Sequence, residues 1–237
     1  MNKWLPAVWL IASAKNGISS YELGRSIGVT QKSAWFMLHR IRLAMQAGEF
    51  RPMSGEVEVD ETFIGGKARF MHKVKRAEKI KGTGGMGKAA VMGLLERYGP
   101  DGHSVVRAKV VASRRRHTLS PEVRANVIPG SEVFSDALKS YSDLKADFVH
   151  QVIDHAETYV EGRVHTNGIE NFWSLLKRSI KGTYVSVEPF HLFRYLDEQS
   201  FRFNTRRATD ADRVVRVLEA VVGRRLTYDE LIGAASS

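Results

Sequence analysis

The sequence predicts an α/β fold in which a small helical region precedes a mixed β-sheet with flanking helices. Two patterns lead to this class. Up to about residue 50, apolar residues recur at helical spacing. From residue 56 onward, short apolar, β-branched runs alternate with turn signals and with further helical segments. Alternation of this kind is typical of a sheet that packs helices against its faces.

The N-terminal region is expected to form a helix-turn-helix. Helices are predicted over 5–14, 21–27 and 31–47. Gly28 would make the turn between the last two, and Thr30 would cap the third. In a DNA-binding helix-turn-helix this third helix enters the major groove. A three-helix packing unit without a nucleic-acid role is the alternative. The side chains expected to be exposed on this helix are Gln31, Lys32, Ser33, His39, Arg40 and Arg42.

The next hundred residues predict five strands and two helices. The strands are expected over 56–64, 89–95, 104–111, 132–135 and 148–153. The helices would open at Ser120 and at Ala137. This order matches a ribonuclease-H-like core, in which the first and fourth strands are neighbours. Asp60 and Asp136 would then meet, although either aspartate alone could be an edge residue or a helix cap.

A third acid lies in a helix that is predicted to begin at Thr166 or Asn167. One face of this helix is an apolar stripe assigned to the core, consisting of Ile169, Phe172, Trp173 and Leu176. Another face carries the polar residues Asn167, Glu170, Ser174 and Lys177. By itself this is an amphipathic helix with a solvated face. Beside two aspartates, the second face becomes the third wall of an acidic site.

The charge of the chain points to a polyanionic partner. The net charge is +10, and residues 67–88 carry eight lysines and arginines against one acid. Lys67, Lys73, Lys75 and Arg76 in this stretch are expected to contact DNA phosphates, with a solvated loop as the alternative.

Cysteine is absent, which excludes disulfides and cysteine-based zinc modules. No apolar run is long enough for a membrane span, so a cytoplasmic protein, on the nucleoid when bound to DNA, is expected.

Three carboxylates suit metal-dependent phosphoryl transfer. Mg²⁺ prefers oxygen ligands and keeps several waters, so two or three carboxylates can hold it. Two such ions can activate the attacking oxygen and stabilise the leaving oxygen. We therefore expect Mg²⁺, or Mn²⁺, as the cofactor.

Three sequence motifs resemble the DDE transposases of bacterial insertion sequences. The third motif of one branch is His-Thr-Asn-x-Ile-Glu-x-Phe-Trp-x-x-Leu-Lys-Arg followed by Gly-Thr-Tyr, and this chain has it from His165 to Arg178 and at 182–184. The first acid of the family corresponds to Asp60 within the run 59–67, and the second to Asp136 in Ser-Asp-Ala. The resemblance covers residues from about 20 to 207.

The resemblance implies roles for individual residues. Asp60, Asp136 and Glu170 would be catalytic metal ligands, with Asn167 as the rival of Glu170 for the third position. Lys177, followed by Arg178, would contact a DNA phosphate near the site. Relatives usually carry an amino-terminal zinc ribbon with paired cysteines, which this chain lacks.

The expected function is that of an insertion-sequence transposase. It would cleave DNA strands at the element ends and transfer the 3′-hydroxyl into target DNA. Its partners would be double-stranded DNA, as terminal inverted repeats and as target, and a second copy of itself in a dimer. The expected division is a helix-turn-helix over 1–50, a ribonuclease-H-like catalytic domain over 54–207 and C-terminal helices over 208–237. The alternatives are a non-catalytic DNA-binding remnant and a nuclease on the same fold.

Overall fold

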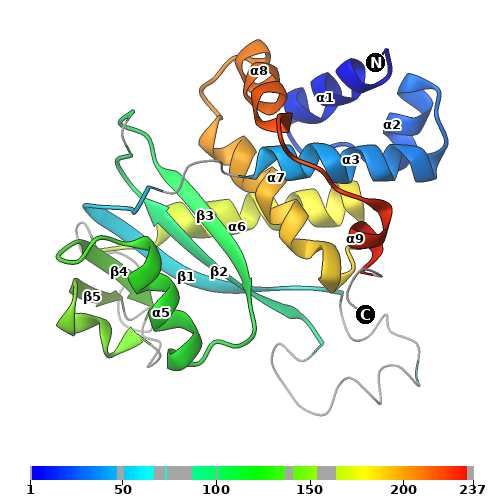
Figure 1. Cartoon of the computed structure of the whole chain (residues 1–237). Coiled ribbons are helices and arrows are strands. Elements are labelled where there is room, and N and C mark those ends of the chain that lie inside the picture. Colours follow the sequence, from blue (N-terminus) through cyan, green and yellow to red (C-terminus); the bar gives the residue numbers. More distant parts are fainter. Residues whose placement is uncertain are drawn as a thin grey trace. The chain divides into compact units, whose positions relative to one another are not determined.

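The computed structural model describes residues 2–46, 51–66, 73, 87–99, 101–136, 141–153 and 164–233. The chain forms two compact units, each assembled from segments that are distant in the sequence (Figure 1). The first unit comprises Met1–Glu49, Arg178–Val185 and Phe193–Ser237, and the second comprises Phe50–Lys177 and Ser186–Leu192. The division into three consecutive ranges stays a prediction.

The second unit is built on a mixed sheet of five strands. The strands are β1 (Glu56–Ile64), β2 (Ala89–Glu96), β3 (Val105–Val111), β4 (Glu132–Asp136) and β5 (Val149–Ile153). Their order is β3-β2-β1-β4-β5. β1 is antiparallel to β2 and parallel to β4, and β4 is parallel to β5. The α/β class and the neighbouring first and fourth strands are therefore confirmed, and the sheet is compatible with a ribonuclease-H-like fold.

Helices flank both faces of this sheet because successive residues of a strand point to opposite sides. Val57 and Val59 of β1 lie in one apolar core with Leu119 and Val123 of α5 (Arg116–Asn126). The alternate residues of β1, beginning with Glu58, face α6 (Asn167–Ser179), as the contact between Glu58 and Ile169 shows. Asp60 therefore lies on the face of Glu58, opposite to the core residues Val57 and Val59.

Two helix predictions in this unit are wrong. α5 begins at Arg116, so Pro121 lies inside the helix instead of opening it. The hydroxyl of Ser120, which we expected to cap the helix, donates to Asp143 Oδ1 at 2.7 Å, while Leu119 packs in the core. Core packing therefore outweighs the hydrogen bond that proline removes. The helix expected from Ala137 would begin at residues 137–140, which lie outside the described residues. Its expected continuation is wrong, because the described residues from 141 onward form turns and a short 3₁₀ segment, Leu144–Ala146.

The first unit is helical. α1 (Trp4–Ser13), α2 (Ser20–Ile27), α3 (Gln31–Met45) and α8 (Asp210–Val221) share one apolar core, in which Val217 of α8 is fully buried. The unit also contains most of α7 (Leu192–Asn204), and α9 (Tyr228–Ile232) with a capping box at Thr227. Within the described ranges, no helix is both long and apolar enough to cross a membrane.

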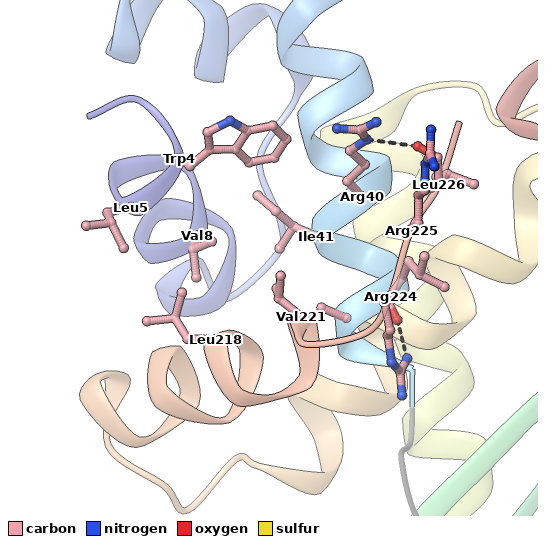
Figure 2. Close-up of a pocket in the computed structure, with 12 residues that line it drawn as sticks. Trp4, Leu5, Val8, Arg40, Ile41, Leu218, Val221, Arg224, Arg225 and Leu226 are labelled. Carbon is pink, nitrogen blue, oxygen red and sulfur yellow. Dashed lines mark hydrogen bonds between the residues drawn. The ribbon is translucent and has the colours of Figure 1, made fainter. Parts of the chain in front are cut away.

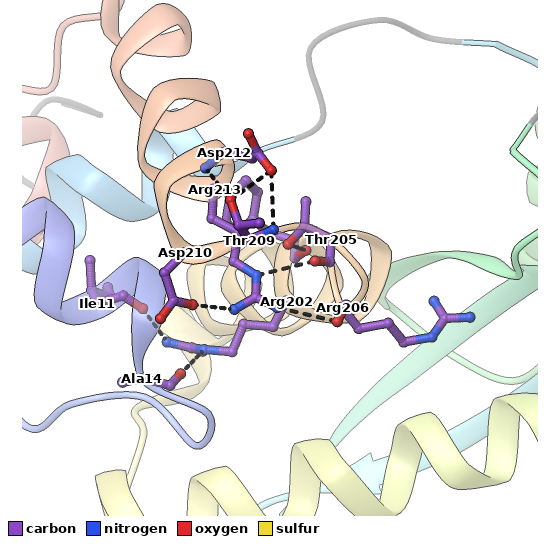
Figure 3. Close-up of polar contacts among 10 residues, drawn as sticks. Ile11, Ala14, Arg202, Thr205, Arg206, Thr209, Asp210, Asp212 and Arg213 are labelled. Atoms are coloured by element: carbon purple, nitrogen blue, oxygen red, sulfur yellow. Dashed lines mark hydrogen bonds and ion pairs between the residues drawn. The ribbon is translucent and has the colours of Figure 1, made fainter.

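Polar contacts join α7 to α1 within this unit. Arg202 donates from Nε to the carbonyl of Ala14 at 2.7 Å and from Nη2 to the carbonyl of Ile11 at 2.9 Å (Figure 3). These carbonyls belong to the end of α1, where backbone acceptors lack helical partners. Arg213 of α8 similarly binds the carbonyl of Thr205 at 3.1 Å and Asp210 at 2.7 Å (Figure 3). The C-terminal helices are therefore structural parts of the N-terminal unit.

An apolar pocket of about 510 Å³ also lies in the first unit. Arg40 donates to the carbonyl of Leu226 at 3.0 Å, and Arg224 donates to the carbonyl of Leu43 at 2.5 Å, so residues 224–226 form one wall (Figure 2). The other lining residues come from α1, α3 and α8.

Candidate active site

Asp60 and Asp136 lie side by side in the sheet. β1 and β4 run parallel with Val59 opposite Ser135, and each aspartate is the next residue of its strand. Both side chains are half-buried. The negative charge of Asp136 also acts on the carboxyl group of Asp60 and raises its pKa. We inferred from the order of the strands that these two acids lie close together. The register of β1 and β4, with Val59 opposite Ser135, places them next to each other.

The carboxylate of Asp60 is held by two hydrogen bonds. The backbone N–H of Glu61 donates to Oδ1 at 2.7 Å, and the indole Nε1–H of Trp173 donates to Oδ2 at 2.9 Å. The pKa of Asp60 is raised to about 6, mainly by burial and also by the charges of Asp136 and Glu170, while the two hydrogen-bond donors act to lower it. Asp60 is thus fixed in position while it lies among other acids.

Glu61 is a fourth acid near Asp60 and Asp136. The sequence pattern indicated no role for it. Burial raises the pKa of Glu61 to about 8, and the charges of Asp136 and Asp60 contribute in the same direction. Arg114 opposes this shift. The Oε1 atom of Glu61 is buried and has no hydrogen-bond partner among the described residues. Its position directly after Asp60 was the only signal available in the sequence.

Helix α6 presents the two faces that the sequence predicts. The apolar stripe is buried, with at most 3% of any of its side chains exposed. The polar residues Asn167, Glu170, Ser174 and Lys177 are exposed, as is Arg178. Glu170 is the member whose charge acts on Asp60, and its Oε1 accepts a hydrogen bond from the Thr166 hydroxyl at 2.9 Å.

The beginning of α6 is bound to β1 and to Arg97, the residue that follows β2, by contacts that the sequence pattern did not indicate. Glu58 Oε2 accepts from the backbone N–H of Ile169 at 2.8 Å, which satisfies one of the free donors at the start of the helix. Arg97 donates to Glu58 at 2.8 Å and to Glu56 at 2.8 Å, and it also binds His165. Glu58 is 1% exposed, so this ion pair is largely removed from solvent. The contacts are long-range, and local pattern gave no sign of them.

The acids can serve as ligands of a divalent cation by their chemistry. Among the described residues, no group of three or more His, Asp or Glu side chains is already arranged to hold a metal ion. However, the donor set consists of carboxylate oxygens, which Mg²⁺ prefers. Neighbouring positive charge does not balance these acids. The pKa values of Asp60 and Glu61 are raised, and Oε1 of Glu61 has no hydrogen-bond partner among the described residues. The residues therefore fit a Mg²⁺ or Mn²⁺ ion.

The residues expected to read DNA from α3 differ in their exposure. Gln31, Lys32 and Ser33 are exposed, and Gly28 and Thr30 form the expected turn and cap. The expected exposure of His39 and Arg42 is wrong, since they are 0% and 1% exposed. They face the interior because Arg42 forms a 2.6 Å ion pair with Glu198 and His39 packs against aromatic rings.

The C-terminal segment contacts the outer face of the same helix. The Tyr228 ring lies 5.6 Å from the Lys32 ammonium and 6.2 Å from the Phe36 ring. Arg40 is half-buried, and its Nε bond to Leu226 engages part of the side chain that we expected to contact DNA. Of the four basic residues expected at the loop, Lys73 is exposed, and Lys67, Lys75 and Arg76 lie outside the described residues.

Comparison with known proteins agrees with the motifs. Residues 52–204, more than half of the chain, match the family described as the ISXO2-like transposase domain. An uncharacterized transposase-like protein of Haemophilus influenzae is 35% identical over 96 residues, which make up 40% of this chain and 77% of that protein. Both findings confirm the resemblance drawn from the three acidic motifs, and membership of such a family implies DNA binding. The chain therefore belongs to the insertion-sequence transposases that carry an ISXO2-like transposase domain.

Proposed function

We propose that the chain is a catalytically active DDE transposase that cleaves DNA at the ends of its insertion sequence and joins them to target DNA. One observation chiefly supports this proposal. Asp60, in the middle of β1, and Asp136, the last residue of the parallel strand β4, are neighbours, and the charge of Glu170 from α6 acts on Asp60. Family membership, the basic stretch and the net charge of +10 agree with a DNA substrate.

In this proposal Asp60, Asp136 and Glu170 hold Mg²⁺ or Mn²⁺, which would supply an activated oxygen nucleophile and neutralise charge on the phosphate. The protein residues fix the geometry. Water attacks the scissile phosphorus, the P–O bond to the 3′ oxygen breaks, and that oxygen leaves as a hydroxyl. The 3′-hydroxyl then attacks a target phosphodiester and displaces its 3′ oxygen. No covalent protein–DNA intermediate is required.

The remaining residues are assigned to DNA positioning. Lys177 lies two turns beyond Glu170 on the same exposed face of α6, where its ammonium can contact a phosphate near the acids. Arg178 and the basic stretch around Lys73 would extend this contact. Gln31, Lys32 and Ser33 would read the terminal repeats through the helix-turn-helix of α2 and α3. A homodimer on DNA would bring two element ends together.

The proposal is tested with the purified chain and DNA carrying its own terminal inverted repeats. We expect strand cleavage and joining with Mg²⁺ or Mn²⁺, and none with chelator. Asp60→Asn, Asp136→Asn and Glu170→Gln should each abolish both steps while the affinity for end DNA stays unchanged. Comparing Glu170→Gln with Asn167→Ala decides which of the two is the third ligand.

Three outcomes would contradict the proposal. Full strand transfer by Asp136→Asn would remove the second acid from the catalytic set. Tight binding of end DNA without cleavage by the wild-type chain would favour the non-catalytic remnant. Cleavage without joining would favour the nuclease.

A further inference from the structure

The indole of Trp173 is a buried polar contact of the first acid. The side chain is 3% exposed, and its Nε1–H donates to Asp60 Oδ2 at 2.9 Å. An indole nitrogen can only donate, and a buried donor without a partner is costly. Its acceptor is the carboxylate of Asp60, the first acid of the proposed catalytic set. We had assigned Trp173 to the core, and burial alone does not account for this bond.

The two hydrogen bonds on Asp60 restrict the orientation of its carboxylate. The second bond comes from the backbone N–H of Glu61, at 2.7 Å on Oδ1. Each carboxylate oxygen offers two lone pairs, so each keeps one for another ligand. With both oxygens engaged, rotation of the carboxylate would break at least one bond. The lone pairs that remain are therefore directed to a defined place.

A glycine in the next strand makes room for the indole. Gly93 of β2 is the register partner of Asp60 in β1. A Cβ atom at Gly93 would lie 2.6 Å from Cζ2 and 2.7 Å from Cη2 of Trp173, far inside van der Waals contact. The backbone of Gly93 does not have the positive φ that would itself require glycine. Because glycine in a strand interior weakens the strand, the space for Trp173 is the reason for it here.

A second bond one turn earlier sets the register between α6 and β1. Glu58 accepts from the backbone of Ile169, and Asp60 accepts from the indole of Trp173. Residues 58 and 60 share one face of the strand, and residues 169 and 173 are one turn apart on the helix. The two spacings are both about 6–7 Å, so the bonds can form together. Glu170, which follows Ile169, is carried to Asp60 by this pairing.

We propose that Trp173 is a positioning residue that holds the Asp60 carboxylate. Together with the Glu58–Ile169 bond, it aligns α6 so that Glu170 lies beside Asp60. Gly93 provides the space for the indole ring. The importance of this contact for catalysis rests on the proposed transposase activity. The hydrogen bond between Trp173 and Asp60 does not depend on that activity, so the bond and its effect on catalysis are tested separately.

The contact itself is tested without DNA or metal. The chain has four tryptophans, so a ¹⁵N-indole NMR spectrum should show four Nε1–H signals, and Trp173→Phe identifies one of them by its loss. In Asp60→Ala that signal should shift and exchange faster with solvent, while the other three stay unchanged. An unshifted Trp173 signal in Asp60→Ala would overturn the proposal, whatever the activity of the protein.

The positioning role is tested by cleavage of end DNA. Trp173→Phe keeps an aromatic ring but removes the donor, and we expect the cleavage rate to fall roughly 10- to 100-fold, as is typical when a group supporting a metal ligand is lost. The affinity for end DNA and the thermal midpoint should change little. The matched control is Trp9→Phe, on a half-exposed residue of α1, which should keep the wild-type rate.

Gly93 provides an independent check. Gly93→Ala should shift the Trp173 signal and lower the rate in the wild-type chain. In the Trp173→Phe background the same change should cost much less, because the two ring atoms that it would strike are gone. Any loss of rate that Gly93→Ala causes equally in both backgrounds is attributed to a clash with Ile169, whose Cδ1 lies 2.7 Å from the added Cβ. Equal losses in both backgrounds, or a wild-type rate for Trp173→Phe in an active protein, would contradict the positioning role.

Discussion

The two units contain charged clusters of opposite electrostatic character. In the first unit Glu198 is 1% exposed and bonds to Arg42 at 2.6 Å, while Arg202 and the Tyr184 hydroxyl bind its other oxygen. The Arg42 guanidinium also lies over the Tyr195 ring at 4.1 Å. Although burial alone would raise the pKa of Glu198, these cationic and hydrogen-bonding partners lower it to about 2.

In the second unit the acids have neighbours of like charge. Asp60 and Glu61 are less deeply buried than Glu198, yet their pKa values rise to about 6 and about 8. Asp136 contributes to both shifts. A compensated buried charge can hold a structure together, whereas an uncompensated group of acids destabilises it and is characteristic of a site that binds something positive. The difference supports a structural role for the first cluster, and it agrees with the proposed binding of a cation by the second.

The largest expected effect is on catalysis by the second cluster. Asp136→Asn should lower the rate of DNA cleavage by about 10³-fold or more, because the groups of such a site act as a unit. The free energy of unfolding should not fall, since a negative charge is removed from among other acids. Rate and urea unfolding are measured on the same preparation. A stability loss as large as the one expected for Glu198 would erase the contrast between the clusters.

Removing the acid from the first cluster should affect stability instead. Glu198→Gln leaves Arg42 buried without its counter-charge, and we expect a loss of about 3–5 kcal/mol in the free energy of unfolding. Urea denaturation measures this. Glu219→Gln, at an exposed position of α8, is the control and should change stability by less than about 0.5 kcal/mol. A near-neutral Glu198→Gln would show that the ion pair does not hold this unit together.

The pH dependence of stability separates the clusters further. Asp60 and Glu61 bind protons more tightly when folded, so their contribution to stability is complete below their ordinary pKa values of 3.8 and 4.5. It is lost as the pH rises through about 6 and about 8. Glu198 behaves oppositely, contributing fully above 4.5 and losing its contribution as the pH falls through about 2.

In chelator, the free energy of unfolding should therefore fall by roughly 5 kcal/mol between pH 5 and pH 8, given about 1.4 kcal/mol per pKa unit. Glu61→Gln should show a smaller fall. An identical pH profile for wild type and Glu61→Gln would contradict the raised pKa of this carboxyl group.

Divalent cations should stabilise the second cluster. If Mg²⁺ binds only the folded chain, it adds about 2.7 kcal/mol at a hundredfold excess over its dissociation constant. The thermal midpoint of the wild type should rise with Mg²⁺, and that of Asp60→Asn should rise much less. Glu198→Gln should keep the full response despite its lower starting midpoint. Equal responses in wild type and Asp60→Asn would exclude this cluster as the binding place.

The smallest expected effect concerns a single phosphate contact. Lys177→Ala should weaken DNA binding by roughly 1 kcal/mol and reduce the slope of log affinity against log salt by about 1. Lys177→Arg keeps the positive charge and is the matched control. An unchanged salt slope in Lys177→Ala would mean that this side chain makes no phosphate contact.

Features that depend on local periodicity could be predicted from the amino-acid sequence. Strand alternation, turn residues and the 3.6-residue repeat identified the strands, the buried stripe of α6 and the order that makes β1 and β4 neighbours. Because that order matches a ribonuclease-H-like core, Asp60 and Asp136 could be paired and a third acid sought on the helix that follows. The family could be identified for the same reason, because its motifs are contiguous runs of residues.

Contacts between side chains that are far apart in the sequence could not be predicted in this way. Helical periodicity placed Arg42 outward, and its partner Glu198, 156 residues away, draws it into the interior. The bond from Trp173 to Asp60 spans 113 residues, and the indole looked like a core residue because its apolar ring dominates the pattern. Such pairings depend on the three-dimensional path of the chain and on the cost of burying an unpaired polar group, neither of which appears in a local window of sequence.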